Sequence, residues 1–149
     1  MMLRIALANA DATRALGARL AGLLRPRDVV LLEGELGAGK TELARGCIQA
    51  LAGAAIEVPS PTFNLLLTYD TPGGTVWHFD LYRVERPEEL EELGVDEAFA
   101  DGISLVEWPD RLPVPPRDAL HVTLRHEGEG RAAEFNGSGT WPARLANLA

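Results

Sequence analysis

The sequence predicts an α/β protein in which short buried strands alternate with amphipathic helices. The runs "VVLLE" and "ISLVEW" are compact and apolar, as in strands that are covered on both faces. The first run leads directly into a glycine-rich loop, after which apolar residues recur at helical spacing. Two further pairs of runs flank glycine-containing turns and predict hairpins. Because 149 residues suffice for one sizeable core and are few for two, we expect a single domain over residues 1–149.

The first third of the chain is predicted to form strand, helix, strand and helix. "LRIALA" alternates like a strand, and Asn9 or Asp11 can then cap a helix in which leucines such as Leu16 and Leu20 recur at helical spacing. The buried strand "VVLLE" follows "RPRD". The next helix, "TELARGCIQALAG", keeps its apolar residues on one face and is expected to stop at Gly53.

The rest of the chain is predicted to form two hairpins, a short helix and one more buried strand. "NLLLTYD" and "TVWHFDLYRV" flank the turn "TPGG". "RPEELEEL" has Pro87 near its first helical position and Gly94 just past its end, as short helices often do. "ISLVEW" is ended by Pro109, and the surface connection "DRLPVPPRD" leads to a closing hairpin of "ALHVTLRH" and "RAAEFNG". The tail is expected to form at most a short helix.

Composition and charge argue against several classes of protein. A net charge of −8 gives the chain no general attraction for phosphate backbones, which disfavours direct binding to nucleic acid. No stretch approaches the roughly 18 apolar residues of a membrane span, and the N-terminus lacks the layout of a signal peptide, so we expect a cytoplasmic protein. The single cysteine, Cys47, excludes an internal disulfide and is expected to pack in a helix.

Much of the negative charge lies in residues 85–102, where eight carboxylates accompany one arginine. The simpler interpretation is a helix face that is exposed to solvent. The alternative is a docking surface for a basic partner.

Residues 34–41 form a glycine loop that matches the pattern G-x-x-x-x-G-K-[ST], with Gly37 as an additional glycine. Glycines let backbone N–H groups curl around phosphate oxygens, and the start of the following helix adds partial positive charge. Lys40 is the only lysine of the chain, and its thin, flexible stem can reach between the β- and γ-phosphates, where a planar guanidinium would be bulkier. Thr41 would place its hydroxyl on Mg²⁺. The alternative is a glycine-rich turn with an exposed lysine.

Two carboxylates are candidates for binding Mg²⁺ and orienting water. Glu107 ends the apolar strand "ISLV", and the alternative for it is an exposed strand end. Asp80 lies in "WHFDLYR", where alternation places it on one face with His78, among apolar neighbours. Such a charge needs a partner, so Asp80 has either a functional role or a structural pair with Arg83. His78 is interpreted as a core histidine rather than a base.

The segment "PSPTF" is stiffened by prolines on both sides of Ser60 and presents Thr62 on a rigid arm. Near a phosphate site, such a hydroxyl suits a switch that senses the γ-phosphate or magnesium. A proline-braced turn is the alternative. Trp108 directly follows Glu107 and is expected either to pack against a nucleotide or to fill the core.

Five blocks resemble a known family, because "GELGAGKTELARG", "PSPTFNLL", "HFDLYRV", "EELGVDEAF" and "ISLVEWPDRL" occur in the order and spacing of the bacterial TsaE (YjeE) family. The resemblance covers about residues 10–112. It implies a P-loop NTPase-like three-layer fold, with a central parallel sheet extended by antiparallel strands and hairpins. It also implies a component that binds and hydrolyses ATP in the machinery that forms N6-threonylcarbamoyladenosine (t6A) at position 37 of tRNA.

The resemblance implies partners and site residues as well. The partners are the TsaD and TsaB proteins; tRNA would be reached only indirectly, through that complex, and any self-association is expected to be weak. Lys40, Asp80 and Glu107 become the catalytic residues, and Thr41, Asp80 and Glu107 the ligands of Mg²⁺. The residues expected to contact ATP are Glu35, Leu36, Gly37, Ala38, Gly39, Lys40, Thr41, Glu42, Thr62 and Trp108.

Glu42 departs from the family, which usually has a second Thr or Ser there, with a hydroxyl that can touch the α-phosphate. A carboxylate in this place is expected to weaken or reshape that contact unless it turns outward to pair with a neighbour such as Arg45.

Three classes of function are compatible with a phosphate-binding loop alone. A GTPase needs the N-K-x-D signature, which cannot exist in a chain whose only lysine is Lys40. A small-molecule kinase needs an arginine-rich lid, and no such insertion is visible, although Arg83, Arg86 and Arg111 keep this alternative open. A binding module that does not hydrolyse ATP needs fewer acids than the pair Asp80 and Glu107. The sequence therefore favours an ATPase.

Overall fold

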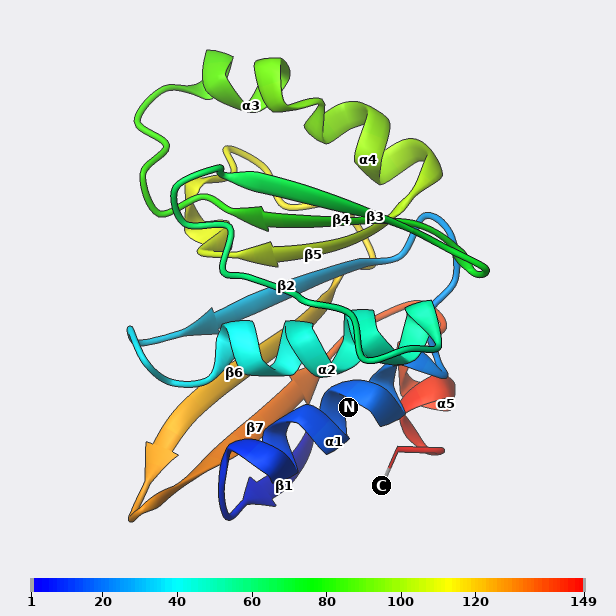
Figure 1. The fold of residues 1–149 in the computed structure, drawn as a ribbon, viewed down its shortest axis with the longest axis vertical. Helices are drawn as coiled ribbons and strands as arrows, with labels where there is room; N and C mark the ends of the chain where they lie inside the picture. Colours follow the sequence, from blue (N-terminus) through cyan, green and yellow to red (C-terminus); the bar gives the residue numbers. More distant parts are fainter. Residues whose placement is uncertain (1, 149) are drawn as a thin grey trace.

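The computed structural model describes residues 2–148 and contains one seven-stranded sheet (Figure 1). Its strands are β1 (Met2–Leu7), β2 (Val29–Gly34), β3 (Leu66–Thr71), β4 (Gly74–Asp80), β5 (Ile103–Glu107), β6 (Leu120–Glu127) and β7 (Gly130–Asn136). Its helices are α1 (Ala10–Ala21), α2 (Lys40–Ala52), α3 (Pro87–Leu93), α4 (Val95–Asp101) and α5 (Trp141–Leu145), with a 3₁₀ turn, η1 (Pro109–Arg111).

The middle of the sheet is parallel and both of its edges are antiparallel. The strand order is β1-β7-β6-β2-β5-β4-β3, in which the four strands β6, β2, β5 and β4 run parallel to one another. The hairpin partner β3 extends one edge, and β7 and β1 extend the other. This arrangement confirms the predicted central parallel sheet with antiparallel extensions.

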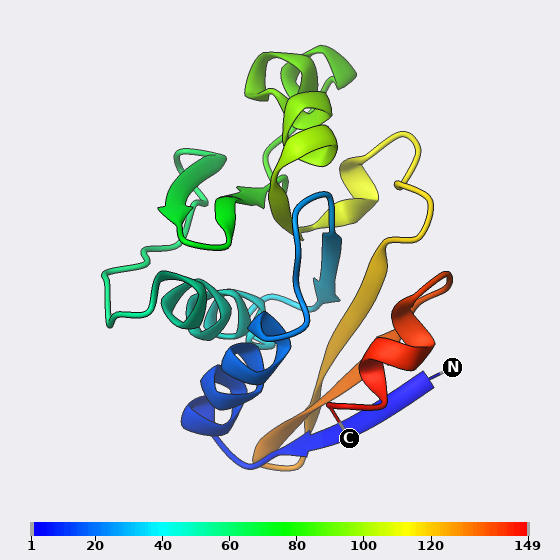
Figure 2. The same cartoon turned by 90° about the vertical axis from the view of Figure 1, so that its right-hand side faces the viewer.

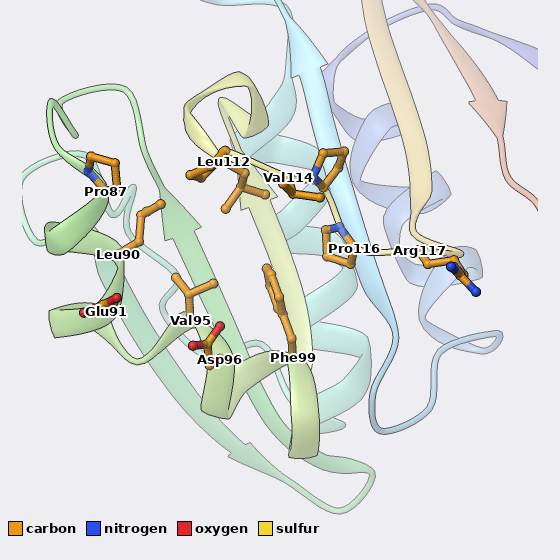
Figure 3. Close-up of a pocket in the computed structure, with 12 residues that line it drawn as sticks. Pro87, Leu90, Glu91, Val95, Asp96, Phe99, Leu112, Val114, Pro116 and Arg117 are labelled. Carbon is orange, nitrogen blue, oxygen red and sulfur yellow. The ribbon is translucent and has the colours of Figure 1, made fainter.

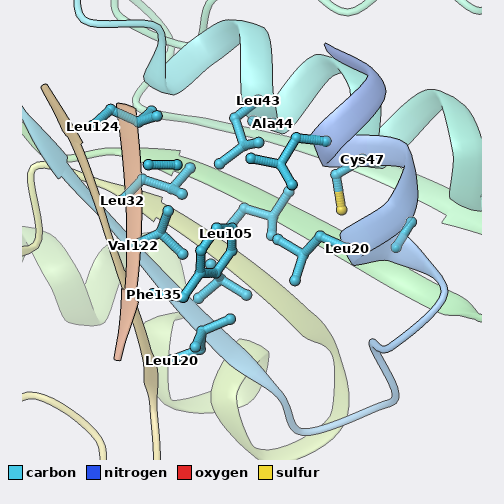
Figure 4. Close-up of a cluster of buried hydrophobic side chains, with 14 of the residues drawn as sticks. Leu20, Leu32, Leu43, Ala44, Cys47, Leu105, Leu120, Val122, Leu124 and Phe135 are labelled. Atoms are coloured by element: carbon cyan, nitrogen blue, oxygen red, sulfur yellow. The ribbon is translucent and has the colours of Figure 1, made fainter. Parts of the chain in front are cut away.

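Two apolar cores lie on opposite faces of the sheet, because successive side chains of a strand point to opposite sides. From β2, Val30 and Leu32 join the core that includes α1 and α2, which Figure 4 shows together with Phe135. Val29 and Leu31 join the second core, below α3 and α4. Figure 2 shows these two pairs of helices well apart from each other. The strand "VVLLE" is therefore covered on both faces, as its continuous apolar character predicts.

The predicted helix ends agree with the structure. Asn9 caps α1, since its side chain accepts a hydrogen bond from the N–H of Ala12 at 2.9 Å, whereas Asp11 lies inside the first turn. Gly53 ends α2 and Gly94 ends α3, both with positive φ. These caps fix where α2 begins and ends relative to the glycine loop.

Two elements differ from the expectation. The helix α4 was not predicted; it begins directly after Gly94 and buries Val95 and Ala98 between acidic residues. The strand β4 ends at Asp80, earlier than "TVWHFDLYRV" indicates, because the Asp80 side chain accepts a hydrogen bond from the N–H of Tyr82 and the chain turns there. Within residues 2–148, no helix is long and apolar enough to cross a membrane.

Candidate nucleotide site

The glycine loop joins β2 to α2, so that it lies at the carboxyl end of a central strand. Gly37 and Gly39 adopt backbone φ values of 79° and 107°, which residues with a Cβ atom rarely adopt. Gly39 is the N-cap of α2 and provides no side-chain cap. The N–H groups at the start of this 13-residue helix therefore face the loop, as in an anion-binding helix terminus.

Lys40 points back along the loop. Its Nζ donates hydrogen bonds to the carbonyls of Gly34 at 2.6 Å and Glu35 at 2.9 Å, and lies 4.1 Å from the centre of the Trp108 ring. Burial lowers the pKa of this ammonium, while Glu107 and Asp80 act in the opposite direction. The cation is held in place by neutral carbonyls that a phosphate can replace.

Glu107 lies at the end of β5 and is only 3% exposed, which excludes the exposed strand end. Thr41 lies beside it, with Oγ1 at 2.9 and 3.0 Å from the two carboxylate oxygens. His78 donates its Nε2–H to Glu107 Oε2 at 2.6 Å from a fully buried position on β4. A buried carboxylate is costly without such partners, and here two side chains hold it in one orientation.

Asp80 lies opposite Glu107 in the parallel pair of β4 and β5. Its Oδ2 accepts a hydrogen bond from Thr62 at 3.0 Å and its Oδ1 one from the N–H of Tyr82 at 3.0 Å. The structural pair with Arg83 is not formed, because the Arg83 guanidinium lies over the Phe63 ring instead. Asp80 thus connects the acidic end of the sheet with the segment "PSPTF".

These side chains surround one cavity of about 250 Å³. Its lining consists of Leu36, Gly37, Gly39, Lys40, Thr41, Glu42, Ser60, Thr62, Asp80, Glu107 and Trp108. Two of the residues expected to contact ATP do not line it. The backbone carbonyl of Glu35 accepts a hydrogen bond from Lys40. Ala38 is buried in the core that includes α1 and α2, and its N–H donates a hydrogen bond to the same carbonyl.

Glu42 turns toward two neighbouring arginines, which is the arrangement in which its carboxylate is not expected to disturb the α-phosphate contact. One oxygen pairs with Arg14 on α1 at 2.6 Å, and the other pairs with Arg45 on the next turn of α2. Both arginines offset its charge, and Glu42 still lines the cavity. The contact with Arg14 also joins the start of α2 to α1.

Trp108 neither fills the core nor points to solvent. It is half-buried, it lines the cavity, and its ring packs against Tyr82 with the centroids 4.8 Å apart. Its backbone has φ 57° and ψ 56°, an unusual conformation for a bulky residue. Such strain occurs where the surroundings hold a side chain in one place, here above Lys40.

Sequence reasoning did not connect His78 with Glu107. Its position two residues before Asp80 on the same face of a strand was the available signal, but the partner lies on another strand. The contact of Tyr82 with Trp108 was also not predicted, because the two residues lie in different segments of the chain. Among residues 2–148, His78 Nδ1 is one of four buried side-chain atoms without a hydrogen-bond partner.

The donor atoms at the end of the cavity fit a magnesium ion. Thr41 and Thr62 offer hydroxyl oxygens, and Asp80 and Glu107 offer carboxylates, which are the hard ligands that Mg²⁺ prefers. The same cavity also contains the cationic Lys40 and the N–H groups at the start of α2, which suit an anion. The cavity therefore has a negative side and a positive side, as a complex of a phosphate with a cation requires.

Fold and site together define a class of protein: an α/β protein whose strand, glycine loop and helix are built like the phosphate-binding loop of nucleotide-binding proteins. The family can be named as well, since the model of "Threonylcarbamoyl adenosine biosynthesis protein TsaE" matches residues 7–133. The chain belongs to this family, which confirms the resemblance seen in the five sequence blocks.

Relatives and a solved structure agree with this membership. The protein "tRNA threonylcarbamoyladenosine biosynthesis protein TsaE" of Rickettsia felis is 45% identical over 124 residues, covering 81% of this chain and 72% of the relative. The protein of the same name from a Nostoc species is 38% identical over 141 residues, covering 90% and 85%. The crystal structure of Bacillus subtilis YdiB has a TM-score of 0.84 at 28% identity, over 99% of this chain and 94% of YdiB.

Proposed function

We propose that this protein is a Mg²⁺-dependent ATPase that acts with TsaD and TsaB in forming t6A in tRNA, and that the whole chain works as a single domain in the cytoplasm. One observation carries the proposal: Lys40, Thr41, Asp80 and Glu107 line the same cavity at the end of the glycine loop. Membership of the TsaE family supports the pathway. The partners come from the family resemblance.

The positive side of the cavity would bind the triphosphate. The N–H groups at the start of α2 and the Lys40 ammonium would offset the charge of the phosphate oxygens. Lys40 is already held over the loop by Gly34 and Glu35, so that it needs only to exchange carbonyl oxygens for phosphate oxygens. This role explains why the only lysine of the chain stands here.

The negative side would hold the metal. When bound, Mg²⁺ would shield the negative charge that the reaction concentrates on the phosphate oxygens. Thr41 and Glu107 would hold it, because they already contact each other and Glu107 is fixed from behind by His78. Binding a nucleotide without hydrolysis needs no second acid, whereas this cavity has Asp80 as well.

Asp80 would orient the attacking water. Its hydrogen bond to Thr62 also connects it to the segment "PSPTF", in which Ser60 and Thr62 are 2.8 Å apart. Loss of the γ-phosphate would alter the surroundings of both hydroxyls and release this segment, which gives hydrolysis a route to the protein surface. The change could then be passed to TsaD and TsaB.

The experiment is ATP hydrolysis by the purified chain, alone and with the TsaB–TsaD pair of the same organism. We expect slow turnover alone and stimulation by the pair, and Lys40→Ala abolishes both. Glu107→Gln and Asp80→Asn, compared for ATP binding and turnover, separate the two acids: the first weakens the effect of Mg²⁺, and the second lowers turnover with little change in ATP binding.

Two results contradict the proposal. If ATP binds but every mixture stays at background turnover, the protein is a nucleotide-gated binding module and the catalytic acids are assigned wrongly. If phosphate is transferred to a nucleoside or an aminoglycoside, the protein is a kinase.

A further inference from the structure

A second, larger hollow lies away from the nucleotide site. This α3–α4 groove has a volume of about 510 Å³ and lies between the helices α3 and α4 and the connection 112–117 (Figure 3). Leu90, Val95 and Leu112 line it, and all three are buried residues of the second core. Nothing in the proposed ATPase mechanism uses this groove.

One wall of the groove is stiff and mostly apolar, with the charged Arg117 at its end. The connection reads "LPVPP", and the three prolines restrict its backbone. On this wall Val114 is 79% exposed, so that an apolar side chain is held out beside an apolar groove. A rigid wall loses little conformational freedom when a partner binds to it. An exposed apolar side chain in such a place is typical of an interaction surface.

The opposite wall is acidic. Glu91 and Asp96 are exposed and line the groove, and Figure 3 shows their carboxylates on the α3 and α4 side. Within residues 2–148, no carboxylate of the stretch 85–102 forms an ion pair, whereas six pairs of an arginine with a carboxylate are formed elsewhere. The carboxylates of this stretch therefore have no basic ion-pair partner along the edge of the groove, and they outnumber Arg86 and the groove residue Arg117.

The apolar wall and the acidic wall together indicate which kind of molecule can bind in the groove. A second copy of this chain would carry the same net charge of −8 and would be repelled by the acidic wall. A small ligand needs buried polar groups to orient it, and no unpartnered buried polar atom of the described chain lines the groove. A protein segment with apolar and basic side chains can contact the apolar wall and pair with the carboxylates of the acidic wall.

Phe99 of α4 also lines the groove. We propose that the α3–α4 groove is the docking site for a partner-protein segment that places an apolar side chain against Val114 and Phe99 and directs lysines or arginines at Glu91 and Asp96. This inference rests on the proposed function, because the partner is taken to be a component of the TsaB–TsaD pair. The groove and the nucleotide cavity share no lining residue, so the partner can bind while ATP is present.

The test measures the affinity of the purified TsaB–TsaD pair for the full chain in the presence of ATP and Mg²⁺. Val114→Asp and the double variant Glu91→Lys with Asp96→Lys each weaken binding by about tenfold or more. Val114→Leu keeps the affinity. The double variant Glu57→Lys with Asp70→Lys makes the same change in net charge at two exposed positions outside the groove, and it changes the affinity by less than about twofold. ATP binding by all variants stays normal, which shows that they are folded.

Each other outcome overturns the inference. If the pair binds the groove variants as tightly as the unchanged chain, the partner docks elsewhere and the proposed function stands. If Glu57→Lys with Asp70→Lys weakens binding as much as the groove double variant, the effect is one of general charge. If the pair neither binds the unchanged chain nor stimulates its ATPase, the partner part of the proposed function fails, and the inference fails with it.

Discussion

At the scale of single residues, the orientation of Glu107 depends on a histidine. His78 supplies one of the two side-chain donors of this buried carboxylate. His78→Leu removes that donor, so Glu107 is free to turn away from Thr41. Because a partner behind a metal ligand is usually worth about 10- to 100-fold in metal affinity or activity, we expect the Mg²⁺ concentration for half-maximal turnover to rise by that factor.

A purely structural role of His78 would give a different result. His78→Gln can still donate an N–H from a similar position, so it should restore most of the Mg²⁺ response. ATP binding without Mg²⁺, measured by calorimetry, should change little in either variant. An unchanged Mg²⁺ response in His78→Leu would show that Thr41 alone holds Glu107.

The residues that sequence reasoning could select are those that a local pattern contains. Lys40 and Thr41 stand in a contiguous motif, and Glu107 stands at the end of an apolar run. The contact of His78 with Glu107 depends on how β4 and β5 pair, and the sequence does not contain that register. Asp80 could be selected as an unusual charge, but its actual partner, Thr62, lies in a different segment.

At the scale of elements, the glycine loop is positioned by the contact between α1 and α2. The helices touch at two glycines: a Cβ on Gly46 would lie 2.1 Å from the carbonyl oxygen of Arg14, and one on Gly17 would lie 2.2 Å from that of Leu43. Gly46→Ala gains about 1 kcal/mol of helix propensity. The steric overlap of the new Cβ with backbone atoms costs more than this gain, so we expect a net loss of about 1–3 kcal/mol of stability.

Urea unfolding measures this loss, and Gly22→Ala is the matched control. Gly22 ends α1 with an ordinary helical φ of −64°, and a Cβ there meets its nearest atom at 3.4 Å. The control should be neutral or slightly stabilising, because alanine has less freedom in the unfolded chain. Equal stability of Gly46→Ala and the unchanged protein would show that the two helices can separate without cost.

Most elements were predictable because their signals are local. Caps such as Asn9 and Gly53 and the turn "TPGG" mark ends that the structure has. The helix α4 was missed because it contributes only Val95 and Ala98 to the core, too few apolar residues for a clear period. Its acidic residues are exposed, and that exposure is what makes the α3–α4 groove charged on one side.

At the scale of the whole molecule, the order of the strands lies beyond sequence periodicity. The strand β2 pairs with β5 and β6, which follow it by about 70 and 90 residues, and local patterns cannot choose between such partners. The resemblance of the five blocks to the TsaE family implied a central parallel sheet before the structure was described. Strand propensities alone did not predict that the centre of the sheet is parallel.

The net charge of the molecule gives a prediction about tRNA. With −8 overall, the isolated chain should bind tRNA weakly at physiological salt, because it neutralises few phosphates. Filter binding of labelled tRNA checks this, first with the chain alone and then with the TsaB–TsaD pair added. Retention of tRNA only in the mixture fits the proposed function. Tight binding by the chain alone would mean that it contacts tRNA directly.

The stability of the whole fold can be followed through Cys47. This thiol is 1% exposed at the contact of α2 with α1, and burial raises its pKa to about 12. Thiol reagents attack the thiolate, so at mildly alkaline pH the folded protein should react only when it opens. Labelling should therefore be slow. Gly46→Ala should speed it about tenfold for each 1.4 kcal/mol of stability that it loses, whereas Gly22→Ala should not speed it. Immediate labelling of the folded chain would show that the two helices separate locally, without global unfolding.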